Sequence, residues 1–208
     1  MLPFDLIKKF FRRKIEREQT LYLIVGLGNP GNRYKCTRHN VGFMVLEELA
    51  TWWEVDLKQK SFDALWNRGK IAGKNVILAM PQTYMNLSGN AVAKLLAYFK
   101  VNVSNLIVIH DDLDLPFGTI RLKTGGGNAG HKGLVSIATC LGSGDFIRLR
   151  LGIGKPSDKS RVESYVLEKF ETENSDLLKS IIQLAAEAAA DIVTSGMQQA
   201  MAKYHVKI

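Results

Sequence analysis

Apolar positions in this chain follow two periodicities, and the strand-like one marks six segments. Continuous apolar runs bounded by glycine or acidic residues are typical of buried strands, and they occur at 21–27 and 106–110. Shorter β-branched or alternating stretches predict further strands. These stretches lie at 64–71, 75–79, 119–123 and 146–153.

The helical periodicity appears between these strands. After Asn40, a residue suited to an N-cap, one helix face is formed by Val41, Val45, Leu49 and Trp52. Helices are also expected at 90–99, at about 133–141, at 172–195 and in a short last segment that leads to Tyr204.

Alternation of strands and helices predicts the fold class. Such chains form an α/β domain with a twisted mixed, mostly parallel sheet that helices flank on both faces. The chain has 208 residues, and a domain of this size buries roughly 70% of its unfolded surface without needing disulfides or metals. Residues 21–208 are therefore expected to form one domain.

Residues 1–20 differ from the rest and are interpreted as a basic amphipathic extension. They hold six basic and three acidic residues. Their acidic residues disfavour a transit peptide, and they contain no secretory apolar core. An accessory helix and a membrane-surface anchor both stay open. The apolar residues at helical spacing are Leu6, Ile7, Phe10, Phe11 and Ile15.

Charge and cysteine content restrict the partners and the compartment. The formal charge is +8 and the pI is about 9.5, which favours a polyanionic partner such as nucleic acid. Cys36 and Cys140 form neither a metal spacing nor a disulfide framework, so they fit a reducing cytosol. No apolar run approaches the ~20 residues of a membrane-spanning helix.

A first glycine loop, GLGNPG at 26–31, matches the GxGxxG pattern of dinucleotide sites. That site needs a helix beginning inside the motif to hold the pyrophosphate. Here Pro30 and Gly31 precede NRYKCTRHN, which has no helical apolar period. A tight turn that directs Asn29 into a cleft is the favoured interpretation.

A second glycine loop, GGGNAGHKG at 125–133, fails as a P-loop. The residue after its second matching glycine is His131 rather than Lys, and neither Ser nor Thr follows Lys132. A glycine-rich loop that enters a helix can still offer backbone N–H groups to an anion or oxyanion.

The histidines are candidate acid–base groups, since imidazole titrates near neutral pH. The acidic pair Asp111-Asp112 supplies candidate carboxylate partners. His39 and His131 lie in polar turns at helix starts, whereas His110 and His205 favour structural interpretations. Asp111 follows a strand, at the edge of the sheet where ligands bind in α/β folds. A His–Asp pair across two loops is consistent with this pattern, and a turn-capping role for the aspartate stays open.

The nucleophile of any hydrolysis is expected to be water. Ser143 lacks the G-x-S-x-G frame, neither cysteine is a strong nucleophile, and no metal-ligand spacing is present. Amides can hold a water, a carbonyl or a peptide backbone. The candidates are Asn29, Asn86 and Asn128.

Five collinear motifs resemble those of bacterial peptidyl-tRNA hydrolases. The similarity runs from about Leu21 to Tyr204 and leaves the first twenty residues outside. The motifs are GLGNPGNRYKCTRHNVGF, PQTYMNLSG, HDDLDLPFG, GGGNAGH and RLRLGIGKP.

The resemblance implies a cytoplasmic monomer without cofactor, metal or obligatory protein partner. Its expected substrate is peptidyl-tRNA, recognised at the acceptor end. It would hydrolyse the ester that joins the peptide to the tRNA, and so return tRNA from aborted translation. Among the amides, Asn29 and Asn86 would bind peptide or position water.

Individual site residues follow from the same resemblance. His39 would be the general base that activates water, with Asp111 as its partner. The cleft would be lined by Tyr34 and Tyr84, with His131 and Lys132 also contacting substrate. Residues that approach tRNA phosphates would be Lys123, Arg150 and Lys159.

Lys132 departs from the family pattern, which has Asn after this histidine. Lys donates hydrogen bonds but cannot accept them, so its role is open. An alternative is a non-catalytic RNA-binding or splicing relative on the same fold, because fold alone does not fix activity. Retention of His39, Asp111 and both amides favours the enzyme.

Overall fold

A seven-stranded mixed sheet forms the centre of the protein. The computed structural model describes residues 20–205, so the expected N-terminal extension lies almost wholly outside the described residues. The strand order is β2-β3-β4-β1-β5-β7-β6, and the four central strands, β4, β1, β5 and β7, are parallel. The strands are β1 (Tyr22–Gly26), β2 (Gln59–Ser61), β3 (Ala64–Ile71), β4 (Lys74–Pro81), β5 (Leu106–Asp112), β6 (Ile120–Thr124) and β7 (Ile147–Gly152).

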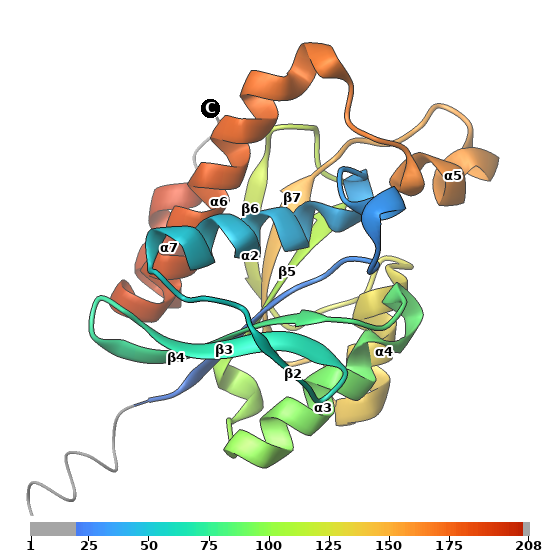
Figure 1. Ribbon diagram of the computed structural model, residues 1–208. Coiled ribbons are helices and arrows are strands. Elements are labelled where there is room, and N and C mark those ends of the chain that lie inside the picture. Colours follow the sequence, from blue (N-terminus) through green and yellow to red (C-terminus); the bar gives the residue numbers. More distant parts are fainter. Residues whose placement is uncertain (1–19, 206–208) are drawn as a thin grey trace, which may run out of the picture.

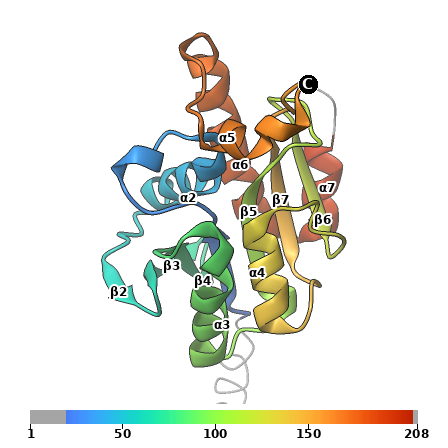
Figure 2. The ribbon, with the colours of Figure 1, turned by 90° about the vertical axis from the view of Figure 1, so that its right-hand side faces the viewer.

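Helices cover both faces of this sheet (Figures 1 and 2). One face carries α2, α6 and α7, and the other carries α3 and α4. The helices are α2 (Val41–Trp52), α3 (Ser88–Phe99), α4 (Lys132–Leu141), α5 (Val162–Leu167), α6 (Ser175–Ser195) and α7 (Met197–Tyr204). Short 3₁₀ helices lie at Asn32–Tyr34, Arg38–Asn40, Met85–Leu87, Val103–Asn105, Lys159–Arg161 and Thr172–Asn174.

Two apolar cores follow from the alternation of side chains along the strands. In β1, Leu23 and Val25 pack in the core beneath α3 and α4, whereas Ile24 packs in the core beneath α2 and α6. Because successive side chains of a strand point to opposite faces, one fully apolar strand supplies both cores. This explains why the run at 21–27 contains no polar residue.

The predicted α/β architecture is confirmed, with boundary differences of a few residues. β5 continues through Asp111 and Asp112, beyond the expected strand end at residue 110, because β7 pairs with them as far as Gly152. β2 and α5 were not predicted from the sequence. Trp52 ends the predicted apolar helix face but is 44% exposed.

Close backbone packing at the carboxyl ends of β1 and β5 fixes where α2 begins. A Cβ on Gly42 would lie 2.3 Å from the carbonyl oxygen of Ile109 and 2.6 Å from the nitrogen of Leu27. Only glycine allows this approach. The turn before α2, which carries His39, is thereby held against the end of β5. No helix within residues 20–205 is long and apolar enough to span a membrane.

Candidate active site

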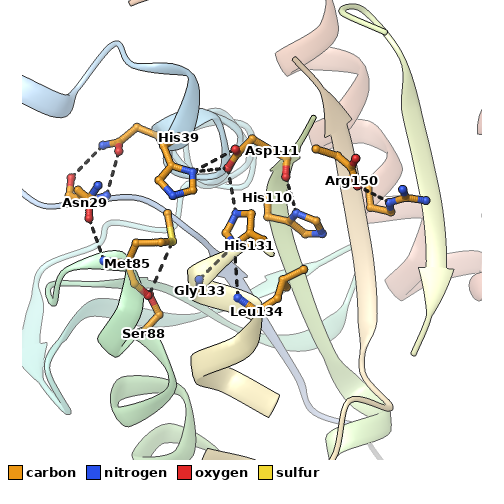
Figure 3. Close-up of polar contacts among 12 residues, drawn as sticks. Asn29, His39, Met85, Ser88, His110, Asp111, His131, Gly133, Leu134 and Arg150 are labelled. Carbon is orange, nitrogen blue, oxygen red and sulfur yellow. Dashed lines mark hydrogen bonds and ion pairs between the residues drawn. The ribbon is translucent and has the colours of Figure 1, made fainter. Parts of the chain in front are cut away.

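His39 and Asp111 form a buried pair at the carboxyl edge of the sheet. His39 lies in the 3₁₀ turn before α2, and its Nδ1 is 2.9 Å from Oδ1 and 3.0 Å from Oδ2 of Asp111 in β5. The two-fold contact places the proton on Nδ1, since a carboxylate only accepts. Figure 3 shows the ring of His39 standing between Asn29 and the carboxylate of Asp111. Nε2 has no hydrogen-bond partner among the described residues and is left to act as a base.

Arg38 holds the turn that carries His39. Arg38 is 6% exposed, and its guanidinium stacks 4.2 Å from the ring centre of Tyr165 and contacts Glu168 at 3.5 Å. The backbone N–H of Arg38 also donates to the carbonyl oxygen of Glu168 at 3.0 Å. The turn is therefore tied to α5 and the segment after it as well as to α2.

His131 is a second imidazole on the same carboxylate. Its Nε2 is 3.0 Å from Oδ1 of Asp111, and its Nδ1 accepts hydrogen bonds from the backbone N–H groups of Gly133 and Leu134 at 3.1 and 3.3 Å. The ring is thus the N-cap of α4. Since Nδ1 accepts, Nε2 carries the proton and donates it to Asp111. The sequence predicted that backbone N–H groups here could bind an anion, and this cap uses two of them, those of Gly133 and Leu134.

Asp111 is held ionised by these two rings. Burial alone raises the pKa of a carboxyl group, but the charges and hydrogen bonds of His39 and His131 outweigh it and hold the pKa of Asp111 well below its ordinary value. A permanent carboxylate at this point stabilises a proton taken up by His39.

The three residues His39, Asp111 and His131 lie close enough together to hold a divalent metal, but the hydrogen bonds of His131 argue against one. Donor atoms of His39, Asp111 and His131 lie within 4.8 Å of one another. A metal on Nε2 of His131 would move that proton to Nδ1, where two N–H groups already point. Nδ1–H would then face two donors, so this set suits a hydrogen-bonded acid–base group and does not fit a metal.

An asparagine pair forms the opposite wall of the site. Asn40 accepts from the backbone N–H of Asn29 and donates to its carbonyl oxygen, both at 2.9 Å. The Oδ1 of Asn29 accepts from the backbone N–H of Met85 at 2.8 Å. The amide NH₂ of Asn29 is therefore its one group left for a ligand. Asn40 stands at the N-cap position of α2 as predicted, but its side chain orders Asn29 and makes no cap hydrogen bond.

The first glycine motif works as the tight turn that the sequence predicted. After β1 the chain runs into short 3₁₀ helices, so no helix begins within residues 26–31 to hold a pyrophosphate. The turn carries Asn29 to the cleft.

Arg148 orders the second glycine loop from below. Arg148 is 2% exposed, and its guanidinium donates to the carbonyl oxygens of Gly127 at 2.7 Å and Gly126 at 2.8 Å, and to Oδ1 of Asn128 at 3.2 Å. The loop needs such an anchor because Gly125, Gly126 and Gly130 have positive φ and few side-chain contacts of their own. Asn128 thus faces Arg148 as well as the cleft.

These elements surround one cleft of about 960 Å³. Tyr34 is the exception among the predicted site residues: it does not line this cleft and lies instead beside Arg33, whose guanidinium is 4.7 Å from its ring centre. The predicted site residues that do line it are Asn29, His39, Tyr84, Asn86, Asp111, Lys123, His131, Lys132, Arg150 and Lys159.

Cations lie along the rim of the cleft, and three of them have acidic partners, Lys155 with Asp114 among them. Nε of Arg150 is 2.7 Å from Oδ2 of Asp112, which fixes the guanidinium at the carboxyl edge of β7. Nζ of Lys132 is 2.7 Å from Oε1 of Glu163 in α5. Such a rim favours an anionic ligand.

His110 is a buried histidine that belongs to the site without an evident chemical role. Its Nδ1–H donates to the backbone carbonyl of Asp111 at 2.7 Å, and its Nε2 has no partner. Burial, aided by the charge of nearby His131, lowers its pKa to about 3. The sequence favoured a structural histidine whose ring nitrogens are both hydrogen-bonded, but only Nδ1 has a partner among the described residues. His205 accepts from the backbone N–H of Leu122 at 2.9 Å, away from the cleft.

Asn40 and Arg148 are functional residues that the sequence interpretation missed. Asn40 was assigned to a helix cap, and its true partner lies 11 residues earlier. Arg148 alternates with apolar neighbours in β7, a pattern typical of a solvent-facing residue. The signal that could have found it is the glycine loop itself, whose carbonyl groups need a donor.

Sequence comparison matches almost the whole chain to one family. The family model described as peptidyl-tRNA hydrolase matches residues 23–208. The peptidyl-tRNA hydrolase of Geobacter sp. (strain M21) is 46% identical over 185 residues, covering 89% of this chain and 98% of the relative. That of Bacillus subtilis (strain 168) is 41% identical over 188 residues, covering 90% of this chain and 100% of the relative.

Structure comparison gives the same result. The crystal structure of peptidyl-tRNA hydrolase from Acinetobacter baumannii superimposes with a TM-score of 0.85 at 40% identity. The match covers 89% of this chain and 95% of that one. Both the sheet and the edge that carries the cleft therefore lie within the region of similarity.

Proposed function

The chain belongs to the peptidyl-tRNA hydrolase family, and from this we propose that it hydrolyses the ester between peptide and tRNA with His39 as general base. Nε2 of His39 takes a proton from a water molecule, and the water oxygen attacks the ester carbonyl. The ester bond then breaks, and the leaving 3′-terminal ribose oxygen of tRNA receives the proton from His39; the peptide is released as its carboxylic acid, which then loses a proton to water.

The contact between His39 and Asp111 carries this proposal. Asp111 accepts from Nδ1, so the tautomer with a free, basic Nε2 is the one present in the cleft. General-base catalysis of this kind typically contributes ~10²–10⁴-fold. His131 donates to the same carboxylate and fixes its direction.

Amides on the far wall would bind the acyl part of the substrate. Asn86, exposed in the 3₁₀ helix Met85–Leu87 before α3, can donate to the developing oxyanion, and such a donor is worth ~2.7–4 kcal/mol in other hydrolases. The free NH₂ group of Asn29 can donate to a peptide carbonyl or hold the attacking water. Tyr84 is 60% exposed and offers a flat surface to the peptide.

The cationic rim would bind the acceptor end of the tRNA. Arg150 is the best ordered of its cations because Asp112 holds its Nε and leaves its outer nitrogens free to donate. Binding through phosphate contacts weakens as salt rises. The rim cations expected to contact phosphates are Lys123, Arg150 and Lys159.

We infer in addition that the enzyme acts as a cytoplasmic monomer. The whole set of catalytic groups comes from one chain, and Cys36 and Cys140 are free thiols. A purely RNA-binding role is disfavoured, because binding phosphates does not require a buried, ionised Asp111 beneath an imidazole.

The decisive experiment compares N-acetylated with free aminoacyl-tRNA as substrates of the purified protein. We expect release of tRNA from the blocked substrate, little from the free one, and loss of ~10²–10⁴-fold in kcat for His39→Ala. His205→Ala, remote from the cleft, is the matched histidine control and should retain activity. Equal cleavage of both substrates, or a His39→Ala variant within a few-fold of wild type, would reject the proposal.

A further inference from the structure

An ion pair bridges the two walls of the cleft beside the catalytic groups. Lys132, the first residue of α4, places Nζ 2.7 Å from Oε1 of Glu163 in α5, 31 residues away in the chain. Both residues line the cleft. The side chains are 62% and 80% exposed, so water surrounds the pair.

Glu163 is a replaceable partner for this lysine. Hydrogen bonding from Lys132 lowers the pKa of Glu163 below its ordinary value, so the carboxylate is charged when the cleft is empty. Ion pairs this exposed are individually weak, because water competes for both charges. A phosphate offers several anionic oxygens and can take the place of a single carboxylate.

The position of Lys132 relative to the reacting ester selects which phosphate it can meet. Lys132 directly follows His131, whose ring donates to Asp111 at 3.0 Å. In peptidyl-tRNA the ester is on the terminal ribose, and the nearest anion is the phosphate on the 5′ side of that same nucleoside. The other cations predicted to meet phosphates come from different elements, Lys123 from β6, Arg150 from β7 and Lys159 from the 3₁₀ helix before α5, so Lys132 is the one that adjoins His131 in the chain.

Resting on the hydrolase function proposed above, we propose that Lys132 exchanges Glu163 for the phosphate nearest the scissile ester when substrate binds. Glu163 keeps the ammonium group directed across the cleft in the free enzyme and releases it to the incoming anion. A neutral amide at this position could donate a hydrogen bond, but it could not contribute a charge. Lys132 therefore adds an electrostatic contact close to the reaction centre.

Two small substrates with the same ester test this exchange. One is the N-acetyl-aminoacyl ester of adenosine, and the other is that of adenosine 5′-monophosphate, which adds the single phosphate in question. The measured quantity is the ratio of kcat/KM for the phosphate-bearing ester to kcat/KM for the phosphate-free ester. We expect this ratio to fall about threefold to tenfold in Lys132→Met and in Lys132→Asn, the range of one exposed to partly desolvated charge contact.

Glu163→Gln is expected to change the kcat/KM ratio in the opposite direction. Removing the competing carboxylate should raise the ratio, and more so at low salt, where charges are least screened. Lys94→Met is the matched control, since Lys94 also forms an exposed ion pair, with Asp63, outside the cleft. Its ratio should equal that of wild type.

An unchanged ratio in Lys132→Met overturns the exchange, whatever happens to activity as a whole, because an equal loss on both esters means that Lys132 acts on the ester or the fold. A fall in Glu163→Gln that parallels the fall in Lys132→Met also overturns it, since the pair would then be a structural tie. Failure of the wild-type enzyme to cleave N-acetyl-aminoacyl-tRNA would reject the proposed function instead.

Discussion

Nδ1 of His39 contacts both carboxylate oxygens of Asp111, a residue 72 positions away in the chain. One partner lies in the turn before α2 and the other near the end of β5, so the contact depends on how closely α2 approaches the sheet. Gly42 makes that approach possible. The geometry of the His39–Asp111 contact therefore depends on the close packing at Gly42.

Asp111→Asn is expected to lower activity while leaving the protein folded. An asparagine amide that donates to Nδ1 would favour the tautomer with the proton on Nε2, which cannot act as a base. We expect kcat to fall by at least about tenfold, though less than in His39→Ala. Single-turnover hydrolysis of N-acetyl-aminoacyl-tRNA measures this, with exposed Asp145→Asn as control; full activity in Asp111→Asn would contradict the tautomer argument.

His110 should make the free energy of unfolding depend on pH. Its pKa in the folded protein is about 3, against an ordinary value of 6.5. Below pH 6.5 the unfolded chain therefore binds a proton that the folded chain refuses, and stability is lost as the pH falls. Between pH 7 and pH 5, His110 alone is expected to lower the free energy of unfolding by about 2 kcal/mol.

Chemical denaturation at these two pH values tests this in wild type and in His110→Asn, whose amide can still donate to the backbone carbonyl of Asp111. The variant should lose less stability on acidification. Asp111 does not affect the comparison. Its pKa is lowered in the folded protein, so the stability that it contributes is lost only when the pH falls below the ordinary carboxyl value of 3.8. An identical pH dependence in both proteins would show that His110 is not held neutral.

Arg148→Met should loosen the glycine loop and lower activity. The substitution leaves the carbonyl oxygens of Gly126 and Gly127 without their donor, and each such loss costs ~1–3 kcal/mol. We expect faster hydrogen exchange of the amides at 125–131 and a fall in kcat. Arg148→Lys should recover part of both, since a lysine can reach one of the carbonyls.

Arg68→Met is the matched control for that experiment, because Arg68 is exposed and stacks on Phe99 outside the cleft. A loop with unchanged exchange rates in Arg148→Met would mean that its shape does not depend on this arginine.

Gly42→Ala is expected to destabilise the fold strongly. The added methyl group would press on the backbone of Ile109 and Leu27, neither of which is a flexible side chain. Overpacking of this kind costs ~1–3 kcal/mol or more. Thermal unfolding measures it against Gly127→Ala, where a Cβ meets nothing within 4 Å; equal melting temperatures would contradict the packing argument.

The sequence predicted most of the sheet because its strands bury both faces. β1 is apolar throughout and β5 is apolar from Leu106 to Ile109, and such continuous apolar runs are typical of strands covered on both faces. β2 was missed because Gln59, Lys60 and Ser61 are exposed and owe their extended form to pairing with β3. α5 was missed because six residues are too few for a periodicity to be distinctive.

The candidate site was predictable only in part. Polar turns after strands indicated where His39 and Asp111 would gather, but that they are partners came from the resemblance to a family. Asn40 could not be found by pattern, and Arg148 only indirectly, through a glycine loop that needs a donor, because both bind backbone groups, which carry no side-chain signature. Tyr34 was carried over with its motif, yet the structure leaves it outside the cleft.

The manner in which Arg148 binds the glycine loop has a bearing on how this loop can be altered. Every residue type has a carbonyl group, so an anchor that grips Gly126 and Gly127 through their carbonyl oxygens does not read their side chains. Residues of ordinary φ in the loop, such as Gly127, are therefore open to replacement without loss of the anchor. An engineer who wished to change what the cleft accepts could diversify this position in a library and keep the strand beneath it fixed.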